Sequence, residues 1–202
     1  MENKTYSTQS FPLTTYTDVA GLPRVEVNVR DDSSDTCNSV FVEKQVEDIQ
    51  RVDTEEREVS VFDVAIYVMG RLKECTTMKL HKLLYYCQAW TLVWDEKPLF
   101  HENIEAWANG PVIRELFAYH KGMFTIKESD LIIGNETSLS PHQRENINDV
   151  LDFYGDKTSQ WLIDQTHMES PWIEARKGLA QTERGNRIIS LDSMYQYYSS
   201  LK

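Results

Sequence analysis

The sequence predicts a mainly α-helical fold: a compact multi-helix domain with a small β-hairpin, preceded by an acidic N-terminal arm with short β-strand content. Two observations support this prediction. From Ser60 onward, apolar residues recur at intervals of three and four, which is typical of amphipathic helices. Apolar residues also make up 41% of the 202 residues and include five Trp, ten Tyr and seven Phe, enough for a packed core. We therefore expect an arm over residues 1–57 and a folded domain over residues 58–202.

The arm differs from the rest of the chain in its charge. It contains six basic and twelve acidic residues, a net charge of −6, whereas the remaining residues together carry −5. Within the arm, Arg24–Arg30 alternates valine with polar residues, which predicts a strand. Residues 40–49 fit either a strand or a helix. Because a single short strand pair is marginal on its own, we expect a semi-ordered arm or a β-element that a partner completes.

Two helix starts follow the arm. Ser60 and Asp63 resemble a capping box, with Asp in place of Glu or Gln, and predict a helix that reaches Leu72. Thr77 can cap a second helix over Met78–Trp94, in which apolar residues recur at i, i+3 and i+4. Because tyrosine and tryptophan residues widen its apolar face, we expect this second helix to be central and buried on more than one side.

The middle of the domain has signals for extended structure and turns. Leu99–Trp107 looks extended, and the pair Asn109–Gly110 predicts a turn. Pro111 can then occupy the first position of a helix that runs to about His120. Residues 130–133 fit a short extended piece.

The last third of the domain is predicted to hold four helices. A Ser-Pro pair at 140–141 opens the first, and Gly155 closes it. A short helix is expected over Ser159–Thr166. A second Ser-Pro pair at 170–171 opens the next helix, and Ser190 caps the last.

Charge and hydropathy argue against two classes of partner. The net charge is −11 and the isoelectric point is about 4.9, and no Lys or Arg run is present, so a phosphate backbone would be repelled. No stretch approaches the ~20 apolar residues of a membrane span, and no apolar run follows Lys4. We therefore expect a cytoplasmic protein whose natural partners are basic proteins, with no membrane and no direct nucleic-acid binding.

The motifs point to no metal, cofactor or catalytic centre. No CxxC spacing is present, and none of the five histidines has a metal-binding interval to a second ligand. Phosphate-cradling glycine loops and GxSxG are missing as well. The three cysteines are interpreted as reduced thiols of a reducing compartment; they are Cys37, Cys75 and Cys87.

The densest polar and aromatic cluster lies over residues 166–176. A catalytic interpretation makes His167 a base that Glu169 or Glu174 orients. This interpretation lacks an obvious nucleophile, because Ser170 looks committed to capping the helix that follows it. It remains the weaker alternative.

A structural interpretation fits both aromatic clusters better. In the first cluster, Trp172 would anchor its helix in the core, His167 would hydrogen-bond across the loop, and Glu174 and Arg176 would be exposed. In the second cluster, residues 107–111, the structural interpretation is a strand-to-helix turn with a buried Trp. A share in a binding groove is the alternative for that second cluster.

Three strings in the domain occur in a specific order. Residues 78–90, MKLHKLLYYCQAW, resemble the signature MKLQKLLYYAQGW. Residues 98–112 resemble PLF…IEAW..GPV, and residues 154–176 resemble YG…L…TH…PW..AR. Together they resemble one known family, the Panacea domain, also called the SocA-like antitoxin domain and found in phage-associated proteins. The resemblance covers roughly Val59–Lys202, so the arm lies outside it.

The resemblance implies a mostly helical antitoxin without enzymatic activity. Members of the family neutralise very different toxins, usually by direct protein binding, whereas the founding type is a proteolytic adaptor that delivers its toxin to a Clp protease. This sequence departs from the pattern in three places: His81 stands where Gln is common, Ala89 where Gly is common, and Arg114 near a position that often holds proline. Arg114 could alter the surface beside Gly110.

The expected function is therefore that of an antitoxin that binds a cognate toxin, one that is basic and encoded next to it. The expected contacts lie in the domain at Trp107, Asn109, Arg114 and Tyr119, and in the arm at Val25, Val27, Phe41 and Glu43. Three alternatives stay open: a proteolytic adaptor acting with a Clp-type protease, a small hydrolase that uses His167, and a DNA-binding autoregulator. The acidic balance argues against the last of these.

Overall fold

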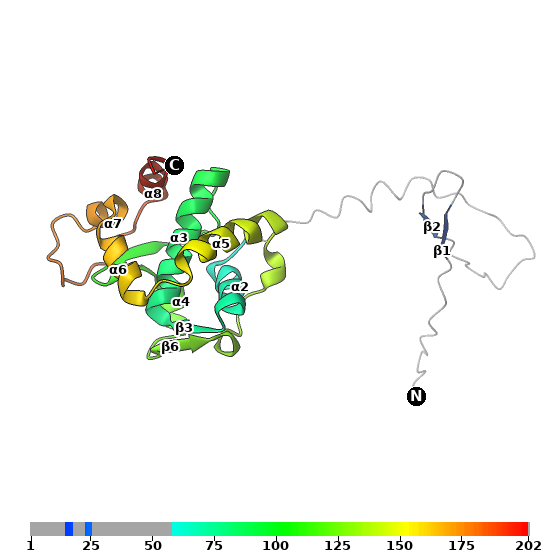
Figure 1. Cartoon of the computed structure of the whole chain (residues 1–202), viewed down its shortest axis with the longest axis horizontal. Coiled ribbons are helices and arrows are strands. Elements are labelled where there is room, and N and C mark those ends of the chain that lie inside the picture. Colours follow the sequence, from blue (N-terminus) through cyan, green and yellow to red (C-terminus); the bar gives the residue numbers. More distant parts are fainter. Residues whose placement is uncertain (1–14, 18–22, 26–57, 202) are drawn as a thin grey trace, which may run out of the picture. The chain divides into compact units, whose positions relative to one another are not determined.

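A computed structural model of the chain describes residues 15–17, 23–25 and 58–201. The chain divides into one unit over residues 1–52 and a second unit over residues 53–202. In the first unit, β1 (Thr15–Thr17) pairs antiparallel with β2 (Pro23–Val25), as Figure 1 shows. The strand predicted over Arg24–Arg30 thus overlaps β2, and the remainder of that prediction lies outside the described residues, as do residues 40–49.

The second unit is mainly helical, which confirms the predicted fold class. Its described residues contain α2 (Val61–Leu72), β3 (Glu74–Thr76), α3 (Thr77–Asp95), β4 (Ile104–Trp107), β5 (Gly110–Ile113), α4 (Arg114–Tyr119), β6 (Thr125–Lys127), the 3₁₀ turns η1 (Glu128–Asp130) and η2 (Glu136–Ser138), α5 (Pro141–Tyr154), α6 (Ser159–His167), α7 (Ser170–Ala175) and α8 (Leu191–Ser199). None of these helices has both the length and the apolarity that a membrane span needs.

Helix α2 begins at the predicted capping box. The Ser60 side chain accepts a hydrogen bond from the Asp63 amide, and the Asp63 carboxylate accepts one from the Ser60 amide at 2.9 Å. These two bonds satisfy amides that have no partner within the helix. The apolar face of α2, which carries Val64 and Val68, is fully buried.

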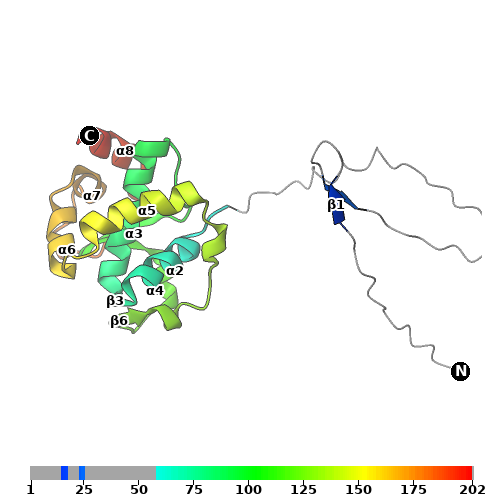
Figure 2. The same cartoon turned by 45° about the vertical axis from the view of Figure 1, so that its right-hand side comes forward.

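Helix α3 runs through the centre of the second unit, as predicted. It begins one residue earlier than expected, because Thr76 and not Thr77 is its N-cap. Nearly every side chain from Leu80 to Ala89 is buried. Helices α5 and α8 pack against it, and Figure 2 shows α5 crossing α3. The core of the unit therefore surrounds α3 on several sides.

Strands β4 and β5 form the expected hairpin, but the prediction for Pro111 is wrong. Pro111 lies in β5 opposite Ala106, and the following helix, α4, begins only at Arg114. At this position the backbone nitrogen of the proline faces away from β4, so its missing hydrogen removes no hydrogen bond between the two strands. Burial of β5 against α3 therefore outweighs the local preference of proline for a helix start.

The extended piece predicted over residues 130–133 is also wrong. The extended segment is β6, which pairs antiparallel with β3 so that Ile126 lies opposite Cys75. It is followed by the 3₁₀ turn η1, in which the Asp130 carboxylate accepts a hydrogen bond from the Lys127 amide at 2.8 Å. A side chain that competes for the backbone in this way favours a turn over a strand.

The C-terminal helices follow the predicted starts closely. Ser140 caps α5 in a capping box with Gln143, and Ser190 caps α8. Helix α7 differs by one residue, because its N-cap is Glu169 and Ser170 is already helical. Between α7 and α8, Ile188 bridges to β4, so the chain returns to the hairpin before its last helix.

Candidate partner-binding surface

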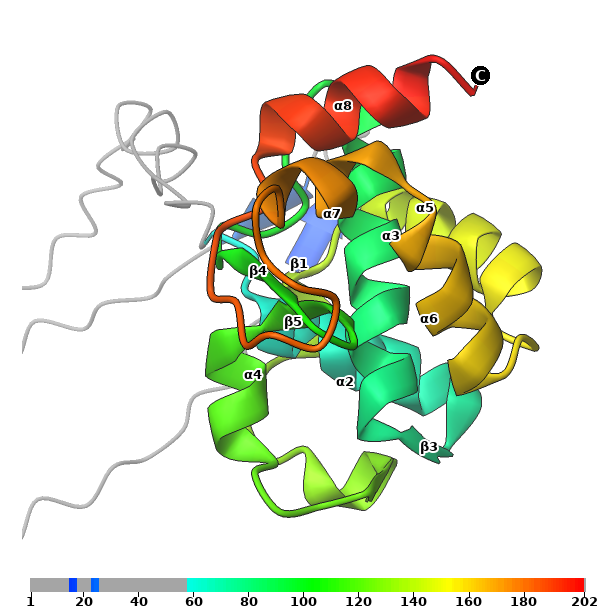
Figure 3. The same ribbon diagram turned by 90° about the vertical axis from the view of Figure 1, so that its left-hand side faces the viewer.

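The β4–β5 hairpin is held against α3 by two buried polar side chains. The Ile113 amide donates to Nδ1 of His81 at 3.2 Å, and Nζ of Lys82 donates to the Pro111 carbonyl at 3.0 Å. Both side chains therefore take the place that a neighbouring strand would occupy along the outer edge of β5. Figure 3 shows the hairpin beside α3, with α4 continuing from β5.

The outer edge of β4 is covered by the segment that leads into α8. The Ala106 amide donates to the Arg187 carbonyl at 2.8 Å, and the Ile189 amide donates to the Ile104 carbonyl at 2.8 Å. The Ala106 carbonyl in turn accepts from Nη1 of Arg176 at 2.9 Å. Because both edges are hydrogen-bonded, the hairpin is a rigid element of the second unit.

Gly110 closes the hairpin at a point where only glycine fits. Its φ of +95° lies in the region that side chains rarely adopt. A Cβ at this position would lie 2.5 Å from Cε of Lys82 and 2.9 Å from Oγ1 of Thr166. The glycine therefore allows the hairpin end to approach α3 and α6 closely.

Trp107, Glu105, Phe117 and Arg114 form one connected group beside the hairpin turn, which we call the Trp107 cluster. Nε1 of Trp107 donates to Glu105 at 2.7 Å, and its ring meets Phe117 edge-on with centroids 4.7 Å apart. Arg114, whose side chain is 67% exposed, lies 3.5 Å from the nearly buried Glu105 carboxylate. Asn109 is exposed at the turn itself. Three of the predicted domain contacts therefore belong to one neighbourhood.

Tyr119, the fourth predicted domain contact, lies apart from the Trp107 cluster. Its hydroxyl donates to the Asp130 carbonyl at 2.7 Å and accepts from the Ile132 amide at 3.1 Å. Its ring meets Phe62 of α2 edge-on. This tyrosine thus fastens the loop after η1 to the body of the domain.

The predicted contacts in the arm are only partly described by the structure. Val25 is the last residue of β2, where it pairs with Thr15. Val27, Phe41 and Glu43 lie outside the described residues. Their part in partner binding stays a prediction.

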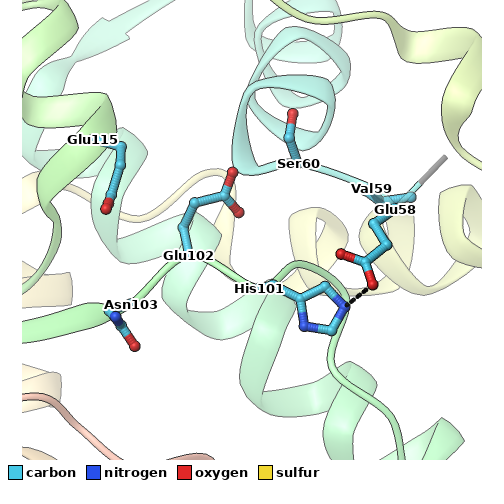
Figure 4. Close-up of a pocket in the computed structure, with 7 residues that line it drawn as sticks. All are labelled: Glu58, Val59, Ser60, His101, Glu102, Asn103 and Glu115. Carbon is cyan, nitrogen blue, oxygen red and sulfur yellow. Dashed lines mark ion pairs between the residues drawn. The ribbon is translucent and has the colours of Figure 1, made fainter.

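An acidic hollow lies where the second unit begins. It has a volume of about 350 Å³ and is lined by Glu58, Val59, Ser60, His101, Glu102, Asn103 and Glu115 (Figure 4). His101 lies 3.8 Å from the Glu58 carboxylate, and Glu102 accepts a hydrogen bond from the Val61 amide at 3.0 Å. Sequence reasoning missed this hollow, because its three carboxylates come from distant segments that share no motif.

A second hollow, of about 360 Å³, lies over the cluster of residues 166–176. The His167 ring stacks on Trp172 at 4.1 Å, and the Arg176 guanidinium lies 5.1 Å from the centre of the same indole ring. Burial lowers the pKa of His167. Among the described residues, no hydrogen bond reaches the buried Nε2 of His167, so no hydroxyl or thiol is joined to it as a nucleophile would be to its base.

Arg176 is buried, although sequence reasoning expected it to be exposed. Besides Ala106, its guanidinium donates to the carbonyls of Ala180, Gln181 and Glu183. These bonds fold the segment after α7 back onto the hairpin. Backbone carbonyl oxygens, one from β4 and the others from the loop directly after α7, thus replace water around the charge.

Two further buried ionisable groups, Glu169 and Lys82, lie in the core around α3. Glu169 accepts hydrogen bonds from the hydroxyls of Tyr86 at 3.1 Å and Tyr198 at 2.7 Å, and burial raises its pKa to about 7. Burial also lowers the pKa of Lys82 to about 7. Both groups are thus shifted towards their neutral forms. In the part of the chain that the structure describes, no group of three or more His, Cys, Asp or Glu is placed to hold a metal ion.

Residues 80–173 match the model of a protein family described as Antitoxin SocA-like, Panacea domain. The match runs from the first turn of α3 to α7 and includes the hairpin and the Trp107 cluster. It supports the family that the three sequence strings indicated. No curated protein and no solved structure gives a significant match to this chain.

Proposed function

Because residues 80–173 belong to the SocA-like Panacea antitoxin family, we propose that this chain is the antitoxin of a toxin–antitoxin pair and neutralises its toxin by direct binding. The observation that carries this proposal is the Trp107 cluster, which lies within the matched range on a hairpin with both edges fixed. The family supports an antitoxin role in general. That the toxin binds through the Trp107 cluster is our own proposal.

The Trp107 cluster has the chemistry of a protein-binding surface. Tryptophan, tyrosine and arginine contribute most often to the free energy of protein interfaces, especially where they lie at the desolvated centre of the interface. Trp107 and Phe117 are half-buried, so each keeps some area for a partner, and Arg114 is exposed beside them. A rigid hairpin loses little conformational entropy when it binds.

The acidic hollow supports a basic partner. Its three glutamates can accept hydrogen bonds from a Lys or Arg side chain, and Glu115 directly follows Arg114 of the Trp107 cluster at the start of α4. The chain as a whole carries a net charge of −11, which attracts a basic protein during diffusion. The toxin would therefore be basic, and we expect its gene beside that of the antitoxin.

We further propose that the arm over residues 1–57 gives this antitoxin its choice of toxin. The arm lies outside the family match and carries a net charge of −6. Its proposed contacts are Val25, Val27, Phe41 and Glu43. Deletion of residues 1–57 should weaken neutralisation, and full rescue by residues 58–202 would contradict a role for the arm.

Co-expression with the neighbouring gene tests the main proposal. A host that dies from the toxin should survive when the full chain is present, and the two proteins should co-purify. Trp107→Ala and Arg114→Ala should each weaken rescue at unchanged antitoxin level. Trp161→Ala removes an indole that is 38% exposed on α6 and serves as the matched control. Loss of rescue in the control but not in Trp107→Ala would refute this surface.

The same assay separates direct binding from delivery to a protease. If the chain neutralises by binding, rescue persists in a host without Clp proteases, and the lifetime of the toxin does not shorten when the antitoxin is present. Rescue that requires the protease would instead make this chain an adaptor.

A further inference from the structure

His81 and His120 form a buried pair that joins α3 to the end of α4. Their Nε2 atoms lie 2.8 Å apart, and both residues are at most 2% exposed. His81 also accepts the Ile113 amide of β5 through Nδ1. One imidazole therefore contacts two elements, β5 and α4, which carry Arg114 and Phe117 of the Trp107 cluster.

The hydrogen bonds fix where the protons of this pair lie. Nδ1 of His81 receives the Ile113 N–H, so the proton of this neutral ring is on Nε2. That proton can only point to Nε2 of His120, which must accept it. Both basic nitrogens are thus occupied as acceptors. A proton added to either ring would place two N–H groups against each other and break one of these bonds.

The pair is also in contact with the Trp107 cluster. The His120 ring meets Phe117 edge-on with centroids 5.7 Å apart, and Phe117 meets Trp107 in the same way at 4.7 Å. We propose that the His81–His120 pair is an acid-sensitive latch: neutral, it positions the Trp107 cluster, and protonated, it releases α4 and β5 from α3. The consequence for toxin binding rests on the proposed function, but the opening of the latch does not.

The surroundings of the pair favour its neutral state. Burial opposes the protonation of His81 most strongly; the ammonium form of Lys82 on α3 and the second imidazole oppose it as well. Strand β5 has no ionisable side chain, and the ionisable residues of α4 are Arg114 and Glu115, both exposed at its start, and Tyr119, whose hydroxyl bonds to Asp130. Burial is the main cause that lowers the pKa of both histidines below 6.5.

The test is a pH titration of the full chain without toxin, continued from pH 7.5 down to the pH at which the buried imidazoles have taken up their protons, and followed by NMR of the ¹⁵N-labelled imidazole and indole groups. The Trp107 indole signal, assigned with Trp107→Phe, should shift or broaden below pH 6.5 at the midpoint at which the buried rings take up protons. In the double variant His81→Gln/His120→Gln it should stay constant. Lys82, which contacts β5 and has a pKa of about 7, is present in both proteins, so its protonation cannot cause a difference between them.

His142 provides the internal control, because it is exposed beside Asp95, which raises its pKa. Its imidazole should titrate above pH 6.5 without any change at Trp107. The latch is refuted if the indole signal of the unaltered chain stays constant, or if it shifts equally in the double variant. Should the double variant fail to fold, the unaltered chain decides: indole and imidazole midpoints that differ by more than half a pH unit refute the latch.

Discussion

The N-terminal and C-terminal halves of α3 face one core but hold their neighbours in different ways. In the first half, His81 and Lys82 bond to single backbone atoms of β5. In the second half, the Tyr86 ring stacks on Tyr154 of α5 at 4.0 Å and meets Tyr198 of α8 edge-on at 6.3 Å. Hydrogen bonds demand strict geometry, whereas ring contacts contribute through buried area. Single polar atoms of His81 and Lys82 thus position the hairpin, whereas the ring surface of Tyr86 helps to position α5 and α8.

The two halves also respond to pH with opposite sign. The folded state lowers the pKa of His81, His120 and Lys82, so these groups favour folding at high pH and lose that contribution as the pH falls. It raises the pKa of Glu169 from 4.5 to about 7, so this group favours folding at low pH and loses its contribution as the pH rises. Variants in each half of α3 and its neighbours therefore test whether the two pH dependences differ in sign.

The largest effect is expected from Gly110→Ala, where the hairpin meets α3. The Cβ would lie 2.5 Å from Lys82 at a φ of +95°. Strain of about 1–2 kcal/mol and crowding of about 1–3 kcal/mol together lower the free energy of unfolding. Gly178→Ala, with a φ of +87° and open space around its Cβ, is the matched control and should show the strain alone. Equal losses in urea denaturation would contradict the close approach of hairpin and helix.

Next in size is the pH dependence that Glu169 gives to the C-terminal half. Between pH 5.5 and 8 the folded chain must ionise this buried carboxyl, which costs roughly 2 kcal/mol of unfolding free energy. Glu169→Gln should therefore gain stability relative to the unaltered chain as the pH rises over this interval. Glu174→Gln, on the exposed side of α7, should change the pH profile little. If the free energy of unfolding of Glu169→Gln changed with pH in parallel with that of the unaltered chain, the carboxyl would not titrate in this range.

The N-terminal half should show the opposite slope, with a smaller effect per residue. His81 and His120 favour folding above pH 6.5 and lose this contribution as the pH falls, because the unfolded chain takes up the protons at a higher pH than the buried pair does. Chemical denaturation of His81→Gln/His120→Gln between pH 7.5 and 5.5 should lack that slope. His142→Gln should retain it. If the double variant shows the same slope as the unaltered chain, the buried pair does not control stability in acid.

The smallest effect is expected at the acidic hollow, outside both halves of α3. Glu115→Gln removes one exposed charge from its wall. The rate of association with the toxin should fall severalfold at low salt, and the difference should vanish at high salt because exposed charges are screened. Stopped-flow mixing measures this rate, with Glu145→Gln on α5 as the control. An equal change in both variants would indicate general attraction without a contribution from the hollow.

Local signals in the sequence were sufficient for most helices. Ser60, Ser140 and Ser190 each cap the helix expected after them, because a cap depends on only a few neighbouring residues. The central position of α3 followed from the width of its apolar face. The resemblance to the family and the mainly helical class were likewise evident from the sequence alone.

Contacts between distant residues could not be predicted from the sequence. Pro111 was expected to begin a helix, because its pairing with Ala106 and the burial of β5 leave no local trace. Arg176 was expected to be exposed, because its bond to the Ala106 carbonyl joins residues 70 positions apart. His81 and His120 are separated by 39 positions, and no spacing rule connects them. The part of the site that depends on tertiary packing was thus missed.

The covered edges of the hairpin determine how another protein can approach it. The outward-facing groups along β5 are bonded to α3 side chains, and those of β4 to residues 187–189 and Arg176. Neither edge can accept an incoming strand, so recognition here must use side chains, and two copies cannot join through this sheet into a growing fibril. The hairpin therefore offers no template for edge-to-edge aggregation, even when the chain is present without a partner.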